Sequence, residues 1–293
     1  MSLKESAGRR AFRLLNAIVL SLLSLVTVYP ILYVVLASFS NPAEFLAHRG
    51  LLITSLGFSL DAYRLVLSNT MILHGYVNTI IVVVSGVALN LLMTSLGAYF
   101  LSRKGMLWRD PIMFLFVFTM FFSGGLVPYY LTVRGLGLDN SYWALIIPTA
   151  VNTFNLILMR TSFLGIPDEI EESAKLDGAS HLTILFRIFL PLSMPVVAVM
   201  ILYYGVGHWN AWFNAMLFIR DRDLYPLQLV LREILVQNDT NAMLVGTDSF
   251  DKGLVAETLK YAVIVVATLP VLALYPFLQK YFVKGMMIGA LKG

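Results

Sequence analysis

Five acidic side chains crowd into ten residues near the middle of this 293-residue chain: Asp168, Glu169, Glu171, Glu172 and Asp177. They belong to residues 166–195, a long polar stretch that lies between two strongly apolar runs. Carboxylates gathered on a water-exposed segment are suited to ion pairing with basic groups of a partner. The stretch therefore predicts a docking surface for a soluble protein.

The same stretch carries the signals for two short helices joined by a turn. Pro167 suits the first helical position, and the acids that follow it complement the helix dipole. Gly178 is free to take the left-handed conformation that ends a helix, and Ser180 can cap a second helix that begins at His181. We expect a compact helix–turn–helix unit here.

Motifs for catalysis and cofactor binding are absent from the sequence. It contains no G-x-x-x-x-G-K-[ST] phosphate-binding loop, no H-E-x-x-H metal site and no nucleophile elbow. It has no Cys, so thiolate ligands and disulfides are excluded. We expect no catalytic residue, no metal site and no cofactor bound by this chain, and its four histidines are scattered: His48, His74, His181 and His208.

Composition places the chain in a membrane. Hydrophobic residues make up 58% of it, charged residues only 13%, and its mean hydropathy is +0.79; a soluble domain carries roughly a quarter charged residues. Apolar runs of about 20 residues can cross a bilayer as helices. Six such runs predict an all-α polytopic protein with six transmembrane helices: Leu14–Phe39, Leu73–Leu101, Pro111–Leu131, Tyr142–Leu164, Leu192–Phe218 and Thr258–Phe282.

The first run and the basic residues indicate the topology. The first run is about 25 residues long, which exceeds the roughly 7–15 of a signal-peptide core, so we expect it to be retained. Six spans place both termini on one side, where the loops and tails carry 13 of the 21 Lys and Arg. The positive-inside rule then predicts cytoplasmic termini, a cytoplasmic acidic stretch, and outer loops at 40–72 and 219–257.

The spacing within the acidic stretch resembles the EAA loop of permease subunits of binding-protein-dependent ABC importers. The family pattern is E-A-A, three residues, G, nine residues, and then I-x-L-P. This chain departs from it only at Ser173, a small residue in place of the first Ala. The matching positions are Glu172, Ser173, Ala174, Gly178, Ile188, Leu190 and Pro191.

Other stretches are similar to the carbohydrate branch of this family, so the resemblance covers essentially the whole chain. It looks closest to importers of oligosaccharides, including uronic-acid oligomers such as alginate or polygalacturonate fragments. The stretches are Asn78-Thr79, Ala98–Arg103, Gly124–Pro128, Gly135–Leu138, Trp143–Pro148 and the tail Lys284–Gly293.

The resemblance implies a type I ABC importer permease fold, with residues 1–293 as a single transmembrane domain in a bacterial inner membrane. It implies a second permease as heterodimer partner, two ATPase subunits that hold ATP and Mg, an extracytoplasmic solute-binding protein, and no nucleic acid. Residues 165–191, the coupling loop, would sit in a groove of an ATPase subunit, and the C-terminal tail is a second candidate contact. The residues implied in coupling are Glu171, Glu172, Ser173, Ala174, Asp177, Gly178, Ile188, Leu190 and Pro191.

Polar and aromatic residues of the fourth and fifth spans are candidates for the sugar pathway, since sugars bind amides, hydroxyls and aromatic faces. Asn152, Asn155 and Met159 share a helical face, although interhelical hydrogen bonding would also explain the amides. An aromatic belt at the water interface would explain the tryptophans. The candidates are Tyr130, Asn152, Asn155, Met159, His208, Trp209, Asn210, Trp212 and Asn214.

Two further features bear on these expectations. Gly124 and Gly125, close to Tyr130, either kink the third span or let it pack closely against a neighbour, and close packing is the interpretation we favour. The outer loop 219–257 is long enough to indicate a protein-contact surface.

Two other classes of function stay open at this point. The spans are almost free of ionisable groups at mid-depth, whereas a proton- or sodium-coupled carrier usually needs such groups or broken helices as ion sites. This favours transport that is driven by energy from a partner protein. The alternative is a secondary carrier or channel for a polar solute. A membrane enzyme would need a catalytic cluster that the sequence does not show.

Overall fold

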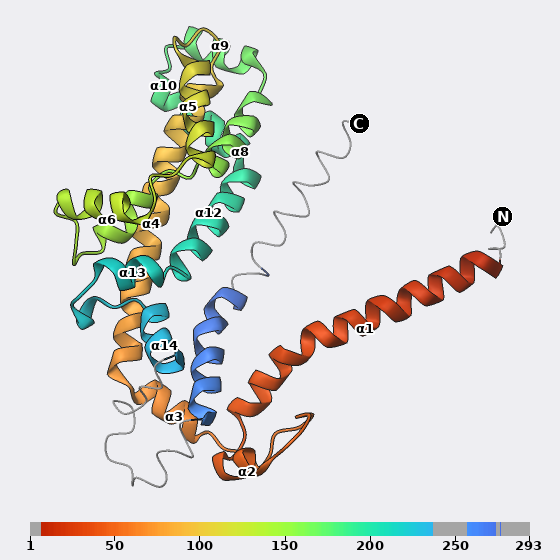
Figure 1. Ribbon diagram of the computed structural model, residues 1–293. Coiled ribbons are helices and arrows are strands. Elements are labelled where there is room, and N and C mark those ends of the chain that lie inside the picture. Colours follow the sequence, from red (N-terminus) through yellow and green to blue (C-terminus); the bar gives the residue numbers. More distant parts are fainter. Residues whose placement is uncertain (1–6, 237–256, 274–275, 277–293) are drawn as a thin grey trace. The chain divides into compact units, whose positions relative to one another are not determined.

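The computed structural model describes residues 7–236, 257–273 and 276, and within them all regular structure is helical. They fall into two compact units, drawn from Met1–Asn69 with Ile234–Thr268 and from Thr70–Glu233 with Leu269–Gly293. The all-α prediction is confirmed. The helices are α1 Ala7–Ser38, α2 Pro42–Ala47, α3 Asp61–Ser68, α4 Thr70–Ser102, α5 Arg109–Phe121, α6 Leu126–Gly135, α7 Trp143–Ile146, α8 Thr153–Leu164, α9 Asp168–Leu176, α10 His181–Ile184, α11 Leu190–Leu192, α12 Met194–Trp209, α13 Phe213–Phe218 and α14 Leu227–Val236 (Figure 1).

The first unit is built around an aromatic cluster at the end of α1. The ring of Tyr33 meets those of Phe45 and Tyr261 edge-on, with centroids 6.3 and 5.8 Å away. Asn41 caps α2 by accepting a hydrogen bond from the backbone N–H of Ala43 at 3.0 Å. Most of α1 is apolar and exposed, as expected of a helix that faces lipid. It corresponds to the first predicted span.

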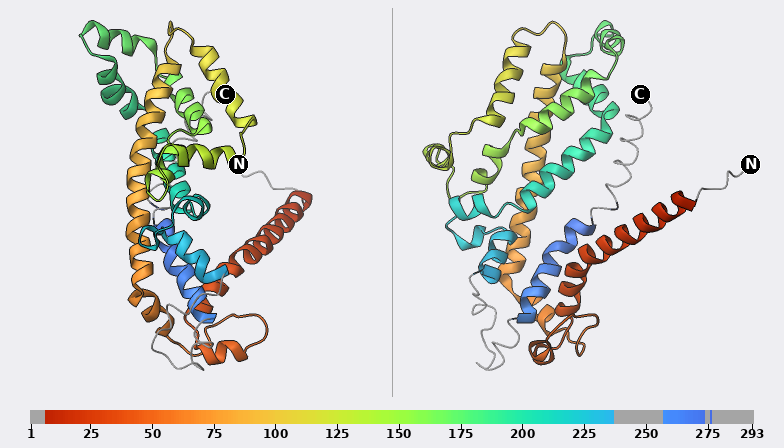
Figure 2. Two further views of the ribbon diagram at one scale, coloured as in Figure 1. Left: turned by 60° about the vertical axis from the view of Figure 1, so that its left-hand side comes forward. Right: turned by 45° about the vertical axis from the view of Figure 1, so that its right-hand side comes forward.

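The second unit is organised along α4. Views from several sides show α8 and α12 running beside this long helix (Figure 2). Its buried positions are mostly small or polar, among them Gly75, Gly86, Thr94 and Ala98. Small side chains let helix backbones approach closely inside a membrane. The packing is completed by a core of large apolar residues: Leu156, Met159, Phe163, Phe189 and Met200.

Two of the predicted spans are bent, and a third bend lies where the coupling loop leads into the fifth span. The helix axes turn by 119° between α5 and α6, by 50° between α7 and α8, and by 89° between α10–α11 and α12. Gly125 causes the first break, because its φ of +84° lies in the left-handed region, and no neighbour packs within 4 Å of where a Cβ would stand. A Cβ on Gly124 would lie 3.6 Å from the Cβ of Pro128 in the same segment, so among the described residues neither glycine packs against another helix, and the kink is the interpretation that the structure supports.

The number of spans follows from how these bends are counted. Two helices are long and apolar enough to cross a membrane alone, and the described residues give up to five spans if each bent pair is one. The predicted fifth span is split, since α12 ends at Trp209 and α13 begins at Phe213. The sixth extends beyond the described residues, which include a helix at 257–273.

The outer loop at 219–257 is not an open loop in its first half. It forms a 3₁₀ turn, Arg222–Leu224, and then α14, whose apolar face is buried. The side chain of Asn78 donates hydrogen bonds to the carbonyls of Asp223 and Tyr225 at 2.7 and 3.0 Å, and the hydroxyl of Thr79 accepts one from the backbone N–H of Leu227 at 2.8 Å. The loop is thus fastened to α4; residues 237–256 and the C-terminal tail 283–293 lie outside the described residues.

The contact between Gly75 and α14 gives a test of this packing. A Cβ on Gly75 would lie 3.1 Å from the Cα of Leu227, whose backbone is held in place by Thr79. Gly75→Ala should therefore destabilise the protein by about 1–3 kcal/mol and lower its thermal midpoint in detergent. Gly135→Ala, where a Cβ meets nothing within 4 Å, is the control and should leave that midpoint unchanged or raise it. If both variants raised the thermal midpoint equally, α14 would not pack against Gly75 as described.

Candidate functional site

The coupling loop forms the helix–turn–helix unit that the sequence predicts. Helix α9 follows Pro167, and it ends where Gly178 adopts a φ of +80°. The backbone N–H of Ala179 then donates to the carbonyl of Ala174 at 2.9 Å, which closes the turn. The hydroxyl of Ser180 accepts from the backbone N–H of Thr183 at 3.2 Å and caps α10. Pro167 itself stands one position earlier than predicted, at the cap rather than inside the helix.

A buried ion pair fastens this loop to the end of α4. Arg103 and Glu171 are 5% and 6% exposed, and a guanidinium N–H of Arg103 donates to the Oε2 of Glu171. A second N–H donates to the carbonyl of Phe163 in α8 at 3.3 Å. The guanidinium also lies over the ring of Phe189, 4.4 Å from its centroid. Arg103 therefore joins α4, α8, α9 and the π-helical turn Leu185–Phe189.

The charge of Glu171 is held by its neighbours. Burial alone would raise the pKa of its carboxyl group, but hydrogen bonds from Lys175, at 2.8 Å, and from Arg103 outweigh burial and lower that pKa below its usual value. Both carboxylate oxygens are thus occupied within the chain. The resemblance implied that Glu171 contacts the ATPase together with Glu172; the structure separates them, with Glu171 inside and Glu172 exposed.

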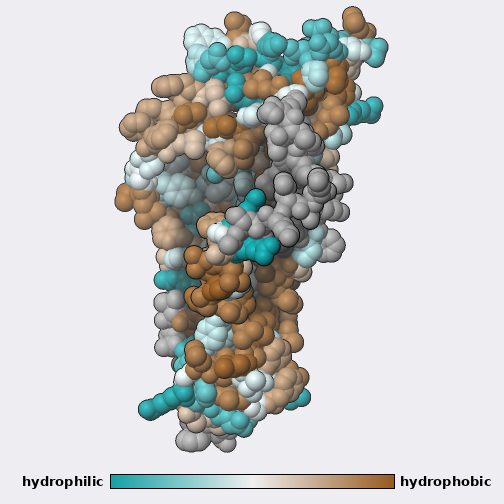
Figure 3. All heavy atoms as spheres, turned by 90° about the vertical axis from the view of Figure 1, so that its right-hand side faces the viewer, coloured by the Kyte–Doolittle hydropathy of each residue, from teal (hydrophilic) through white to brown (hydrophobic). Residues whose placement is uncertain are grey.

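The remaining coupling residues divide between an outer and an inner face. Ala174, Ile188 and Leu190 are partly buried and pack against the core of the second unit. Glu172 is exposed, and so is Leu176, at 90%, on the side of the loop that faces away from this core. Figure 3 shows hydrophilic residues gathered at the end that carries α9 and α10, with apolar residues among them. We call the exposed set the outer face: Glu172, Ser173, Leu176, Asp177, Gly178, Leu182, Phe186 and Pro191.

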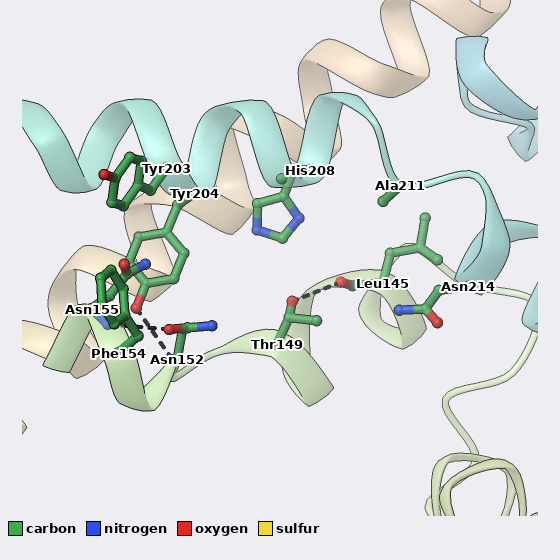
Figure 4. Close-up of a pocket in the computed structure, with 11 residues that line it drawn as sticks. Leu145, Thr149, Asn152, Phe154, Asn155, Tyr203, Tyr204, His208, Ala211 and Asn214 are labelled. Atoms are coloured by element: carbon green, nitrogen blue, oxygen red, sulfur yellow. Dashed lines mark hydrogen bonds between the residues drawn. The ribbon is translucent and has the colours of Figure 1, made fainter. Parts of the chain in front are cut away.

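A polar pocket lies in the same unit, between the start of α8 and the end of α12. Its volume is about 470 Å³, and it combines amide, hydroxyl, imidazole and aromatic side chains (Figure 4). None of its lining residues is a Lys, Arg, Asp or Glu. Four of the candidate pathway residues line it. The lining residues are Leu145, Thr149, Asn152, Phe154, Asn155, Tyr203, Tyr204, Gly207, His208, Ala211 and Asn214.

The other five candidate pathway residues lie elsewhere. Met159 is buried in the core, where its sulfur accepts from the hydroxyl of Ser95 at 3.4 Å. Trp209 packs edge-on against Tyr76, 6.1 Å between centroids, and Asn210 is exposed just beyond α12. The guanidinium of Arg232 lies 5.0 Å from the ring centroid of Trp212, and Tyr130 stacks on Phe218 at 5.7 Å.

Sequence reasoning named His208 but missed the other pocket residues on its face of α12 and in the turn that follows. Tyr204, Gly207, His208 and Ala211 recur at helical spacing and all line the pocket. That spacing is visible in the sequence once His208 is taken as the starting point. Arg103 was also missed as a structural residue, because it entered only as a basic residue of a cytoplasmic turn and as part of the family resemblance at Ala98–Arg103.

The apolar bent helices, the exposed coupling loop and the polar pocket define a permease subunit of a membrane importer. Residues 95–288 match the family described as "Binding-protein-dependent transport system inner membrane component". The chain belongs to this family, as its coupling-loop spacing predicts, and it is a transport subunit with the type I ABC importer permease fold.

Similar proteins cover nearly the whole chain. Two proteins of Bacillus subtilis (strain 168) are each 44% identical to it. "Polygalacturonan/rhamnogalacturonan transport system permease protein YtcP" matches over 97% of this chain and 99% of its own length. "Protein LplC" matches over 100% of this chain and 98% of its own length. A solved "bacterial ABC transporter involved in the import of the acidic polysaccharide alginate" has a chain that is 33% identical, with a TM-score of 0.87, covering 96% of this chain and 100% of that one.

The stability that the buried pair of Arg103 and Glu171 contributes can be compared with that of an exposed ion pair. Glu171→Gln leaves the buried guanidinium of Arg103 without a counter-charge and should cost about 3 kcal/mol of stability at pH 7. Folding lowers the pKa of Glu171. The ionised carboxylate therefore stabilises the fold fully above the pKa of the unfolded state, about 4.3, and this stabilisation is lost as the pH falls through the lower pKa of the folded state. The difference in thermal midpoint between wild type and variant should therefore shrink below about pH 4.

The control for that experiment is the exposed pair between Lys104 and Asp168, 2.5 Å apart, on the same loop. Asp168→Asn should lower the thermal midpoint much less than Glu171→Gln does, since exposed ion pairs contribute little. If the two variants lower the midpoint equally, the pair of Arg103 and Glu171 has no special role in holding the loop.

Proposed function

We propose that this chain forms part of the translocation pathway of an ATP-driven importer for oligosaccharides of acidic sugars. The observation that carries the proposal is that a curated relative and a solved structure, each similar over nearly the whole chain, are importers of polygalacturonan or rhamnogalacturonan and of alginate. A loaded binding protein would deliver the oligosaccharide to the outer side of the membrane. A solved alginate importer that shares this fold was captured with a "periplasmic protein" carrying an alginate pentasaccharide.

The outer face of the coupling loop is the surface that we assign to an ATPase subunit. Leu176, Leu182 and Phe186 expose apolar side chains beside the acids Glu172 and Asp177. An exposed apolar patch rimmed by charge is typical of a protein-binding surface. ATP and Mg would be held by two ATPase subunits, so this chain would take part in coupling without hydrolysing ATP itself.

The ion pair between Arg103 and Glu171 provides a route from that surface to the spans. When the ATPase subunits close on ATP, they would pull on α9. Because Glu171 ties α9 to Arg103, and Arg103 contacts α8 and the turn that leads to α12, the helices would move together with the loop. The pocket between α8 and α12 would then open alternately to the two sides of the membrane.

The assembly that we propose contains a second permease as heterodimer partner, two ATPase subunits and an extracytoplasmic binding protein. The orientation follows from the basic residues, with both termini and the coupling loop in the cytoplasm of a bacterium. The first half of the outer loop, fastened to α4 through Asn78 and Thr79, would give the binding protein a firm surface. A secondary carrier or channel is the alternative.

Leu176 offers the sharpest test of ATPase docking. Leu176→Asp places a charge where the outer face would enter an apolar groove, so we expect at least about a tenfold loss of ATP hydrolysis stimulated by loaded binding protein in the reconstituted importer. Copurification of the ATPase subunits should fall as well. Leu136→Asp, at an exposed leucine outside the coupling loop, is the matched control and should leave both measurements unchanged.

Two results would contradict the proposal. One is full stimulated hydrolysis by the importer that carries Leu176→Asp. The other is sugar uptake by the permeases without any ATPase subunit, which would support the secondary carrier.

A further inference from the structure

The imidazole of His208 is held in one hydrogen-bonding state by its neighbour Asn90 in α4. The side-chain N–H of Asn90 donates to the backbone carbonyl of Thr149 at 2.5 Å. A carbonyl oxygen can only accept, so this bond fixes which end of the amide is nitrogen and which is oxygen. The Oδ1 of Asn90, which is therefore an acceptor, lies 2.7 Å from the Nε2 of His208.

It follows that the proton of the neutral ring sits on Nε2. Since Oδ1 of Asn90 accepts, Nε2 must donate, and Nδ1 keeps a free lone pair. Gly86 makes this arrangement possible, because a Cβ there would stand 2.5 Å from Nε2. The Nε2 edge of the ring is thus pressed against α4, and Asn90 and Gly86 act as positioning residues for His208.

The lone pair on Nδ1 has no hydrogen-bond partner among the residues that the structure describes. The ring projects from α12 toward Thr149, on the side of the pocket that also holds Tyr204 (Figure 4). The hydroxyl of Tyr204 is already engaged by Thr94, at 2.7 Å, and by the backbone N–H of Asn152, at 3.2 Å. His208 lines the pocket and is 7% exposed, so a ligand in the pocket that brings a hydrogen-bond donor can use Nδ1 as its acceptor.

We propose that His208 is a sugar-binding residue that accepts a hydrogen bond from a hydroxyl group of the transported oligosaccharide through Nδ1. The pocket would thus recognise the hydroxyl-bearing part of a sugar ring, with Asn155 and Asn214 as further polar groups and Phe154 and Tyr203 as aromatic surfaces. No Lys or Arg lines it, so the carboxylates of an acidic sugar are recognised elsewhere in the importer. This inference rests on the proposed function and adds to it a single sugar-binding atom, Nδ1 of His208.

Two substitutions separate the roles of the two ring nitrogens. In His208→Asn, the short amide can place its oxygen near the position of Nδ1 but cannot reach Asn90. In His208→Gln, the longer amide can replace Nε2 against Asn90 but leaves no acceptor at Nδ1. We expect His208→Asn to keep most of the uptake and His208→Gln to lose about tenfold, the effect of one buried hydrogen bond.

The measurement is uptake of a galacturonate trisaccharide by proteoliposomes that contain the complete importer, with binding protein loaded with the same sugar. Copurification of the second permease and the ATPase subunits reports on assembly and should be the same for wild type and both variants. The reverse order, with His208→Gln active and His208→Asn inactive, would show that His208 matters only through its contact with Asn90. Equal uptake, or equal loss, in the two variants would also overturn the assignment of Nδ1.

Uptake by the wild-type importer distinguishes a failure of this inference from a failure of the proposed function. If the wild-type importer takes up the trisaccharide and the variants do not follow the expected order, the assignment of His208 fails alone. If the wild-type importer assembles and hydrolyses ATP but takes up no acidic oligosaccharide, the proposed substrate class fails first.

Discussion

The buried pair of Arg103 and Glu171 is the interaction on which the second unit depends. A guanidinium and a carboxylate removed from water are costly, and only close pairing with further hydrogen bonds makes the arrangement tolerable. The chain supplies these through Lys175, the carbonyl of Phe163 and the ring of Phe189. The end of α4 and three elements that lie some 50 or more residues further along the chain therefore meet at the side chain of Arg103. A loop that is charged and exposed on one face is rigid because its other face is fastened in this way.

Helix α4 connects this junction with the rest of the unit. Near its start Gly75, Asn78 and Thr79 hold the first half of the outer loop, and in its middle Gly86 and Asn90 position His208. At its end the chain passes directly into Arg103. A single helix with small and amide side chains on one side thus reaches the outer loop, the pocket and the coupling loop. All three places thus contact the same helix.

Local signals made much of this predictable from the sequence. Pro167, Gly178 and Ser180 determine the ends of the coupling helices through backbone conformation and capping, which depend on few neighbours. Long apolar runs likewise located α1 and α4. The family spacing predicted membership of the family that residues 95–288 match.

Other features depend on contacts that no local pattern encodes. Arg103 and Lys104 are adjacent basic residues, yet one is buried and the other exposed, and only packing against α8 and α9 distinguishes them. Helix α14 was predicted to be part of a polar loop because Arg232 and Glu233 separate its buried Leu231 and Ile234, and because four charged residues, 220–223, precede it. In the pocket, Asn152, Asn155, His208 and Asn214 were chosen for their chemistry, and Met159 was included only because helical spacing cannot say which side faces a cavity.

The division of the coupling loop into two faces has a consequence for exchanging such loops between related importers. Under the proposed function, the outer residues could be matched to a new ATPase without changing the rest of the permease. Glu171 cannot be treated in this way, because its partner Arg103 lies outside the exchanged segment. A graft of residues 165–191 from a permease without a matching acid would strand a buried cation, so compatible donors are those in which both positions are inherited together.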